Sequence, residues 1–231
     1  MKISIIAGAP SVGKTSVLSK TIPFLLKNNE KIAVVKMDCL KSNDEMIYKN
    51  LNIPVITGLS DYLCPDHFLA TNLSGIFSWA KSLNTSYLFI ETAGLCNRCA
   101  PFISKSFNIC TIDCTSSIKN PEKLGPMVWE ADLLLLTKGD MISQAEREIL
   151  IMHLKKINTN CKFIKINGLT GAGCQNFAKK LLDTPDIKSL NGDTLKYPMP
   201  SAICSYCVGE TRIGDEYHQG MVSLMNFNKE D

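Results

Sequence analysis

The stretch GAPSVGKTS, residues 8–16, decides the fold class of this 231-residue chain. It fits the pattern G-x-x-x-x-G-K-[ST], follows the apolar run KISIIA, and opens an expected helix from Lys14 to Leu26. In such a loop the glycines let backbone N–H groups wrap a phosphate chain, and the N-terminus of the helix adds positive potential. The sequence therefore predicts a phosphate-binding loop, or P-loop, that holds a nucleoside triphosphate and Mg²⁺.

The loop residues have separate expected roles. Lys14 would reach the β and γ phosphates, and Thr15 would coordinate Mg²⁺. We expect contacts to the nucleotide from Gly8, Ser11, Val12, Gly13, Lys14, Thr15 and Ser16. Two acidic residues, Asp38 and Glu91, end later apolar runs, and acids at the carboxyl ends of parallel strands face the ligand crevice. Asp38 and Glu91 are therefore expected to join Lys14 in catalysis and Thr15 as Mg²⁺ ligands.

Apolar runs and helical stretches alternate along the first 182 residues. The strand-like runs are KISIIAG, KIAVVKMD, SYLFIET, FNICTID, ADLLLLTK and CKFIKING. The clearest helical stretches are residues 14–26, 65–82 and 143–157. Apolar runs without strict alternation suit parallel strands that are covered on both faces. The pattern predicts an α/β fold with a doubly wound, mainly parallel sheet, and residues 1–183 are the expected P-loop GTPase domain.

Residues 184–231 are expected to form an extension of a different character. The stretch DTPDIKSLNGDTLKYPMPSA is rich in proline, glycine, asparagine and aspartate, which is typical of a linker. The tail that follows carries a C-x-x-C pair, Cys204 and Cys207, and is too short for a core of its own. Small modules of this kind need a metal, a disulfide or the main domain to hold them.

The overall composition excludes several classes of protein. The formal net charge is +3, from 25 basic and 22 acidic residues, which is too balanced to indicate a nucleic-acid partner. Hydrophobic residues make up 45% of the chain, as in a globular protein. No apolar run approaches the roughly 18 residues of a membrane span, and the first run is too short for a secretory signal. We therefore expect a cytoplasmic protein.

A base-recognition element is expected near residue 140. LLLLTKGD resembles the N-K-x-D guanine motif of GTPases, with Thr137 in place of the asparagine. Asp140 can accept hydrogen bonds from the ring N–H and the exocyclic amine of guanine, and Lys138 can pack along the base. Asn167, in INGLTGAG, lies where a second base-contacting loop would fall. GTP is the expected nucleotide, and the threonine leaves ATP open.

The chain has ten cysteines, and in a reducing compartment these favour metal binding or redox chemistry over disulfides. Cys110, Cys161 and Cys174 are expected to be small buried hydrophobic residues. The segment ETAGLCNRCAPF instead places a C-x-x-C pair, Cys96 and Cys99, directly after a strand that should face the phosphates. Their position indicates a chemical role for these two thiols.

The two C-x-x-C pairs can form one site. Four thiolates complete a tetrahedral zinc site or bind an iron–sulfur cluster. We therefore expect Cys96 and Cys99 to join Cys204 and Cys207, which would bring the tail back over the nucleotide face. The alternatives are two independent redox pairs, or a tail whose thiols pair with a client protein.

These motifs together resemble the metallochaperone GTPases that deliver nickel to urease and to NiFe hydrogenase, and the urease protein more closely. The resemblance covers about residues 1–182, and it rests on Asp38, ETAG, the segment DCTSSIKNPEKLGPMVWEADLLLLTKGD and YLCPDHFLATN. At the last of these the urease relative carries a Cys-Pro-His motif that binds nickel or zinc across a nucleotide-dependent dimer. The resemblance implies that Cys64 and His67, or Asp66 in place of His67, bind such a metal across a homodimer.

The resemblance also implies a function. The chain is expected to be a nucleotide-switched maturation factor that hydrolyses GTP and delivers a metal to a client enzyme or its maturation complex. The relatives lack the thiol pair at Cys96 and Cys99 and the cysteine-bearing tail, so neither urease nor hydrogenase is the expected client. The alternative is an ATPase that carries an iron–sulfur cluster and gates electron transfer to a partner. A small-molecule kinase would leave the cysteines unexplained.

Overall fold

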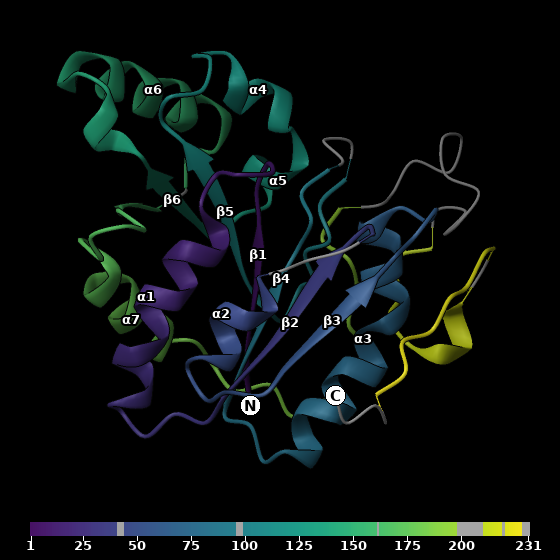
Figure 1. Cartoon of the computed structure of the whole chain (residues 1–231). Coiled ribbons are helices and arrows are strands. Elements are labelled where there is room, and N and C mark those ends of the chain that lie inside the picture. The colour runs from purple at the N-terminus through teal and green to yellow at the C-terminus, as the bar shows by residue number, and fades with distance from the viewer. Residues whose placement is uncertain (41–43, 96–98, 161, 198–209, 219, 228–231) are drawn as a thin grey trace.

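Figure 1 shows the computed structural model of the protein, which describes residues 1–40, 44–95, 99–160, 162–197, 210–218 and 220–227. Within these residues, seven strands form one sheet in the order β3-β2-β4-β1-β5-β6-β7, and all neighbours are parallel. The strands are β1 Lys2–Ala7, β2 Ile32–Asp38, β3 Val55–Leu59, β4 Tyr87–Glu91, β5 Phe107–Asp113, β6 Leu133–Thr137 and β7 Lys162–Lys165. The predicted doubly wound α/β fold is confirmed.

Helices lie between successive strands, except between β4 and β5, where the described residues form no helix. They are α1 Lys14–Leu26, α2 Glu45–Lys49, α3 Pro65–Ser82, α4 Asn120–Leu124, α5 Pro126–Trp129, α6 Gln144–Ile157 and α7 Cys174–Leu182, with 3-10 turns η1 Gly139–Met141 and η2 Asp215–Tyr217. The three predicted helical stretches match α1, α3 and α6. The start of α6 is fixed locally, because the Ser143 hydroxyl accepts from the Glu146 N–H and the Glu146 carboxylate accepts from the Ser143 N–H. In the described residues no helix combines the length and the apolar composition that crossing a membrane requires.

Strand β3 is, among the strands of the described residues, the one that the sequence patterns missed. It has the sequence VITGL, and four of its five residues are exposed or only partly buried. It lies at the edge of the sheet and pairs with β2. A short edge strand needs no long apolar run, which is the signal by which the other strands were recognised.

The sheet buries its two faces in separate cores. On one face Ile5 of β1 belongs to a cluster with Leu69 of α3 and Leu154 of α6. On the other face Ile6 of β1 belongs to a cluster with Leu18 of α1 and the side chains of α7. Adjacent residues of β1 thus point into opposite layers, as strand geometry requires. Figure 1 shows the same division, with α1 and α7 on one side of the sheet and α3 on the other.

The predicted buried cysteines are confirmed where the structure describes them. Cys110 in β5 and Cys174 at the start of α7 are completely buried, and each belongs to one of the two cores. Cys161 lies outside the described residues.

The described part of the C-terminal extension packs against the main domain. Ile187, Leu195 and Ile213 are buried in the same core as α3. Further along, the side-chain Nδ2 of Asn72 in α3 donates to the backbone carbonyl oxygen of Ser223 at 2.9 Å, and the Met225 N–H donates to Asn72 Oδ1 at 2.7 Å. The boundary between a domain of residues 1–183 and an extension of residues 184–231 stays a prediction.

Candidate functional site

The P-loop forms the turn between β1 and α1. Gly8 and Gly13 have φ angles of 141° and 97°, which favour glycine, and a Cβ at Gly8 would overlap the carbonyl oxygen of Thr111. Lys14 is 6% exposed, and its ammonium donates to the carbonyl oxygens of Gly8 and Ala9 at 2.8 and 3.0 Å. Burial lowers the pKa of Lys14 to about 8. The loop therefore holds a cation at the position where a phosphate chain would lie.

A cavity of about 380 Å³ opens beside the loop. Its polar lining includes Lys14, Thr15, Ser16, Lys36, Asp38, Asp44 and Glu91. The structure thus places the four residues predicted for catalysis and Mg²⁺ binding around one cavity. The specific roles of these residues remain predictions.

Glu91 is the centre of a hydrogen-bonded network in this cavity. Its Oε1 atom accepts from the Thr15 hydroxyl at 2.6 Å and from the Lys36 ammonium at 3.0 Å. Its Oε2 atom accepts from the Tyr48 hydroxyl at 2.6 Å. Asp44 accepts from the Thr15 hydroxyl at 3.1 Å and lies 2.9 Å from the Lys36 ammonium. A hydroxyl and carboxylates are hard oxygen donors, so the residues present fit the Mg²⁺ ion that a P-loop implies.

Three members of this network were not predicted from the sequence. Lys36 could have been recognised from the sequence, because a lysine in the middle of a buried strand needs a charged partner. Asp44 and Tyr48 carried no such signal. Asp44 lines the cavity and the buried Tyr48 contacts Glu91 behind it, because α2 packs against β3 and α1, which is a long-range consequence of the fold.

A second cavity, of about 240 Å³, lies along another side of the P-loop. Its lining includes Ser11, Val12, Gly13, Ser16, Thr137, Lys138, Asp140 and Asn167. The predicted base-recognition residues therefore meet beside the P-loop. The Lys138 ammonium donates to the Ser11 carbonyl oxygen at 3.0 Å and pairs with Asp113 at 2.6 Å. The Asn167 side-chain oxygen accepts from two N–H groups of its own loop and so orders that loop.

Thr137, which replaces the asparagine of the guanine motif, connects the base loop to the P-loop. It is 3% exposed, and its hydroxyl lies 2.7 Å from the Val12 carbonyl oxygen and 3.2 Å from that of Ile112. The threonine hydroxyl therefore makes a direct contact between β6 and the phosphate-binding loop. Asp140 lies on η1, directly after this fixed point.

The segment that follows β4 lies against the P-loop. Gly94 has a φ of 73°, and a Cβ there would overlap the carbonyl oxygen of Gly8 and lie 3.3 Å from the Lys14 ammonium. A side chain at this position would therefore force the two segments apart. Because the contact is backbone to backbone, any shift of the P-loop at Gly8 would also act on Gly94.

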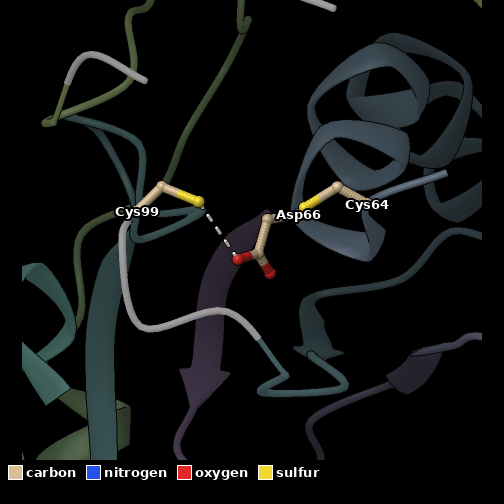
Figure 2. A group of neighbouring side chains, drawn as sticks. All are labelled: Cys64, Asp66 and Cys99. Carbon is tan, nitrogen blue, oxygen red and sulfur yellow. Dashed lines mark hydrogen bonds between the residues drawn. The ribbon is translucent and has the colours of Figure 1, made fainter. Parts of the chain in front are cut away.

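Figure 2 shows a group of two thiols and a carboxylate close to this segment. The ligand atoms of Cys64, Asp66 and Cys99 all lie within 4.8 Å of one another. The Cys99 thiol donates to the Asp66 carboxylate at 3.5 Å. Cys64 is the N-cap residue of α3 and Asp66 lies in its first turn, with Pro65 between them at a position that favours helix initiation. Thus the start of α3 and the loop after β4 together form a candidate metal centre.

The group differs in part from the predicted ligands. Cys64 and Cys99 were predicted, whereas Asp66 was considered only in place of His67. His67 is 3% exposed in α3, and burial lowers its pKa to about 4. It is not part of the three-residue group found among the described residues, and its role as a ligand stays a prediction. Cys96, Cys204 and Cys207 lie outside the described residues.

The described residues on both sides of segment 198–209 lie near the chain that follows Cys99. Residues 194–196 pair through backbone hydrogen bonds and bridges with residues 102–104 and with residues 211–213. The ends that flank Cys204 and Cys207 are therefore held on the same side of the fold as the thiol group. This placement is compatible with the predicted four-thiolate site, which stays a prediction.

Asp66 should give the metal-free protein a characteristic pH dependence. Burial and the neighbouring Cys64 raise the Asp66 pKa from 3.8 to about 7, so the folded state binds this proton more tightly than the unfolded state. The contribution of Asp66 to the free energy of unfolding is therefore largest below about pH 4, and it decreases as the pH rises to about 7. In Asp66→Asn this decline should be absent, a difference on the order of a few kcal/mol.

The measurement is urea unfolding of both proteins between about pH 5 and about pH 8, with a chelator present. Asp61→Asn, at an exposed position shortly before α3, is the control and should follow the wild type. Parallel stability curves for the wild type and Asp66→Asn would contradict the raised pKa.

The comparisons with known proteins agree with this geometry. The sequence matches the family described as "CobW/HypB/UreG, nucleotide-binding domain" over residues 2–165. It is 48% identical over 222 residues to the uncharacterized protein MJ0120 of Methanocaldococcus jannaschii, which covers 96% of this chain and 95% of that protein. It is 26% identical over 171 residues to the hydrogenase maturation factor HypB of Azotobacter chroococcum, which covers 73% of this chain and 55% of the relative.

A solved structure shows the same fold. HypB from Helicobacter pylori, in complex with nickel, superposes with a TM-score of 0.66 at 18% sequence identity. The superposition covers 82% of this chain and 91% of the other. The two chains thus share their fold at low sequence identity.

Proposed function

This chain belongs to the CobW/HypB/UreG family of nucleotide-binding domains, as its motifs indicated, and from that membership we propose that it is a nucleotide-switched metal maturation factor. It binds and hydrolyses GTP with Mg²⁺, carries a transition metal as its cargo, and transfers the metal to a client metalloenzyme. One observation carries this proposal: Cys99, one of the three residues of the thiol–carboxylate group, comes five residues after Gly94, which contacts the P-loop.

The coupling between nucleotide and metal runs through a short stretch of chain. Glu91 ends β4 in the nucleotide cavity, Gly94 touches the P-loop, and Cys99 reaches the metal group. Because a Cβ at Gly94 would overlap the Gly8 carbonyl oxygen, we expect a nucleotide that displaces the P-loop at Gly8 to displace Gly94 as well. Metal affinity should therefore depend on the nucleotide state.

The donor set indicates the kind of metal. Two thiols and one carboxylate suit a borderline ion such as nickel or zinc. Three donors leave a coordination position for a ligand from a client, from a second copy of the chain, or from the predicted ligands His67, Cys96, Cys204 and Cys207. An open position is what a carrier needs in order to release its cargo. Iron–sulfur clusters are held mainly by thiolates, so the carboxylate favours a single ion.

The P-loop residues account for the hydrolysis step. Lys14 neutralises charge that develops on the transferred phosphoryl group. Thr15 and the carboxylates of Asp38 and Glu91 are the proposed Mg²⁺ ligands, and the ion would offset phosphate charge. Asp140 would select guanine, with the Lys138 stem beside the base and Asn167 ordering the neighbouring loop.

Removing one thiol should weaken metal binding. In Cys99→Ala we expect the affinity for Zn²⁺ and Ni²⁺ to fall about 100-fold, since the loss of even an indirect partner of a metal ligand costs 10–100-fold. Anaerobic titration with each metal, without nucleotide and with a non-hydrolysable GTP analogue, measures this. The wild type should show different affinities in the two nucleotide states.

The matched control is Cys174→Ala, which removes an equally buried thiol from the opposite core. It should bind both metals as the wild type does. Wild-type affinity in Cys99→Ala would remove this group as the cargo site. A brown chromophore with acid-labile sulfide in the anaerobic protein would instead favour the iron–sulfur ATPase.

A further inference from the structure

A lysine ammonium lies inside the proposed Mg²⁺ site. Lys36 is 5% exposed in the middle of β2. Its ammonium lies 2.9 Å from an Asp44 carboxylate oxygen and 3.0 Å from Glu91 Oε1. A buried cation is stable only with close anionic partners, so these two contacts hold Lys36 in place.

The oxygens that bind Lys36 also bind the hydroxyl expected to coordinate Mg²⁺. Thr15 Oγ1 lies 2.6 Å from the same Glu91 Oε1 atom and 3.1 Å from the same Asp44 oxygen, so its one proton can serve either of them. A divalent ion on Thr15 would therefore compete with the ammonium for the same two carboxylate oxygens. The Tyr48 hydroxyl holds the other Glu91 oxygen at 2.6 Å, so Glu91 cannot turn to serve both cations without breaking that bond.

We propose that Lys36 is a built-in competitor of Mg²⁺. In the nucleotide-free protein the ammonium neutralises Glu91 and Asp44, and the Thr15 hydroxyl donates to one of these carboxylates. Mg²⁺ alone is excluded, because it would have to displace a cation that is already paired. Mg²⁺ enters with the triphosphate, whose negative charge supplies the additional attraction. The proposal rests on the proposed nucleotide site at the P-loop.

This arrangement assigns different tasks to the two buried lysines of the cavity. Lys14 contacts the carbonyl oxygens of the P-loop and lies where phosphates bind. Lys36 contacts carboxylates of β4 and of the segment before α2. When Mg²⁺–nucleotide displaces it, Asp44 at the N-cap of α2 loses a partner, so α2 would also sense loading of the site.

The test is Lys36→Met, which keeps a long unbranched side chain, one atom shorter, and removes the charge. Without nucleotide, Mg²⁺ should raise the melting temperature of this variant by several degrees and leave that of the wild type unchanged. With a fluorescent GTP analogue, the Mg²⁺ concentration for half-maximal binding should fall at least about tenfold, because the variant loses the close charge pairs that hold the carboxylates. Lys49→Met, which removes an exposed ion pair within α2, is the control and should match the wild type.

Two outcomes overturn the proposal. If Mg²⁺ alone stabilises the wild type, Lys36 does not exclude the ion. If Lys36→Met weakens the GTP analogue equally with and without Mg²⁺, Lys36 is a phosphate contact. Should the methionine variant fail to fold, Lys36→Gln retains hydrogen bonding to the carboxylates without the charge, and the same predictions apply to it. A wild type that binds no nucleotide at all would refute the proposed function instead.

Discussion

Replacing Lys14 with alanine should lower nucleotide hydrolysis by about 10²–10³-fold, which is the usual effect of removing one preorganised electrostatic group. The structure gives the reason, because the ammonium is buried and held by two P-loop carbonyl oxygens rather than by solvent. A cation held in this way needs little rearrangement to meet a phosphate. Single-turnover hydrolysis with protein in excess is the measurement, since switch GTPases turn over slowly without a partner.

The fold should survive this substitution. In Lys14→Ala the two loop carbonyl oxygens lose one donor but remain next to the open cavity, where water can replace it. Circular dichroism and the melting temperature should therefore resemble those of the wild type. Lys20→Ala, at an exposed position of α1, is the matched control and should retain full hydrolysis. Undiminished hydrolysis in folded Lys14→Ala would mean that the activity arises outside the P-loop.

Asp140→Asn should weaken GTP binding by about 100-fold or more, because two charge-assisted hydrogen bonds to guanine are replaced by a mismatched pair. ATP binding should change little. Xanthosine triphosphate, which has a carbonyl oxygen where guanine has its amine, should bind the variant better than GTP does, since the asparagine amide can donate to that oxygen. Competition of the three nucleotides against a fluorescent analogue measures all of these effects.

The nucleotide series contains its own control. A general disturbance of the pocket would lower the affinity for all three nucleotides together. Loss of base recognition would instead change the order of the three affinities. Equal affinity of the wild type for GTP and ATP would remove the guanine assignment. The Thr137 contact to the P-loop carbonyl would then be a structural feature without a role in base selection.

Much of the nucleotide site could be predicted because its signals are local. The P-loop pattern spans a few adjacent residues, and Asp38 and Glu91 were predicted as acids at strand ends. Parallel strands bring such ends to one edge of a sheet, so their convergence follows from the fold class. The sequence also predicted the helices α1, α3 and α6 from the stretches between the apolar runs.

The remainder depends on contacts between distant segments. Nothing near Asp66 in the sequence indicates that its carboxylate accepts from a thiol 33 residues away. Lys36 shows a charge in a buried strand, but its partners come from β4 and from the start of α2. Strand β3 was missed because an exposed edge strand lacks the apolar run that marked the others. In each case the decisive information lies in the packing.

The strand order has a consequence for synthesis on the ribosome. β1 begins at residue 2, and its two neighbours in the sheet begin at residues 87 and 107. At roughly 5–20 residues per second, the first of these partners is made several seconds later. During that interval the apolar strand β1 has no partner within its own chain, and the P-loop behind it has no scaffold. Substitutions that weaken β4 should therefore lower the yield of newly made protein through aggregation, even where the finished molecule would bind nucleotide normally.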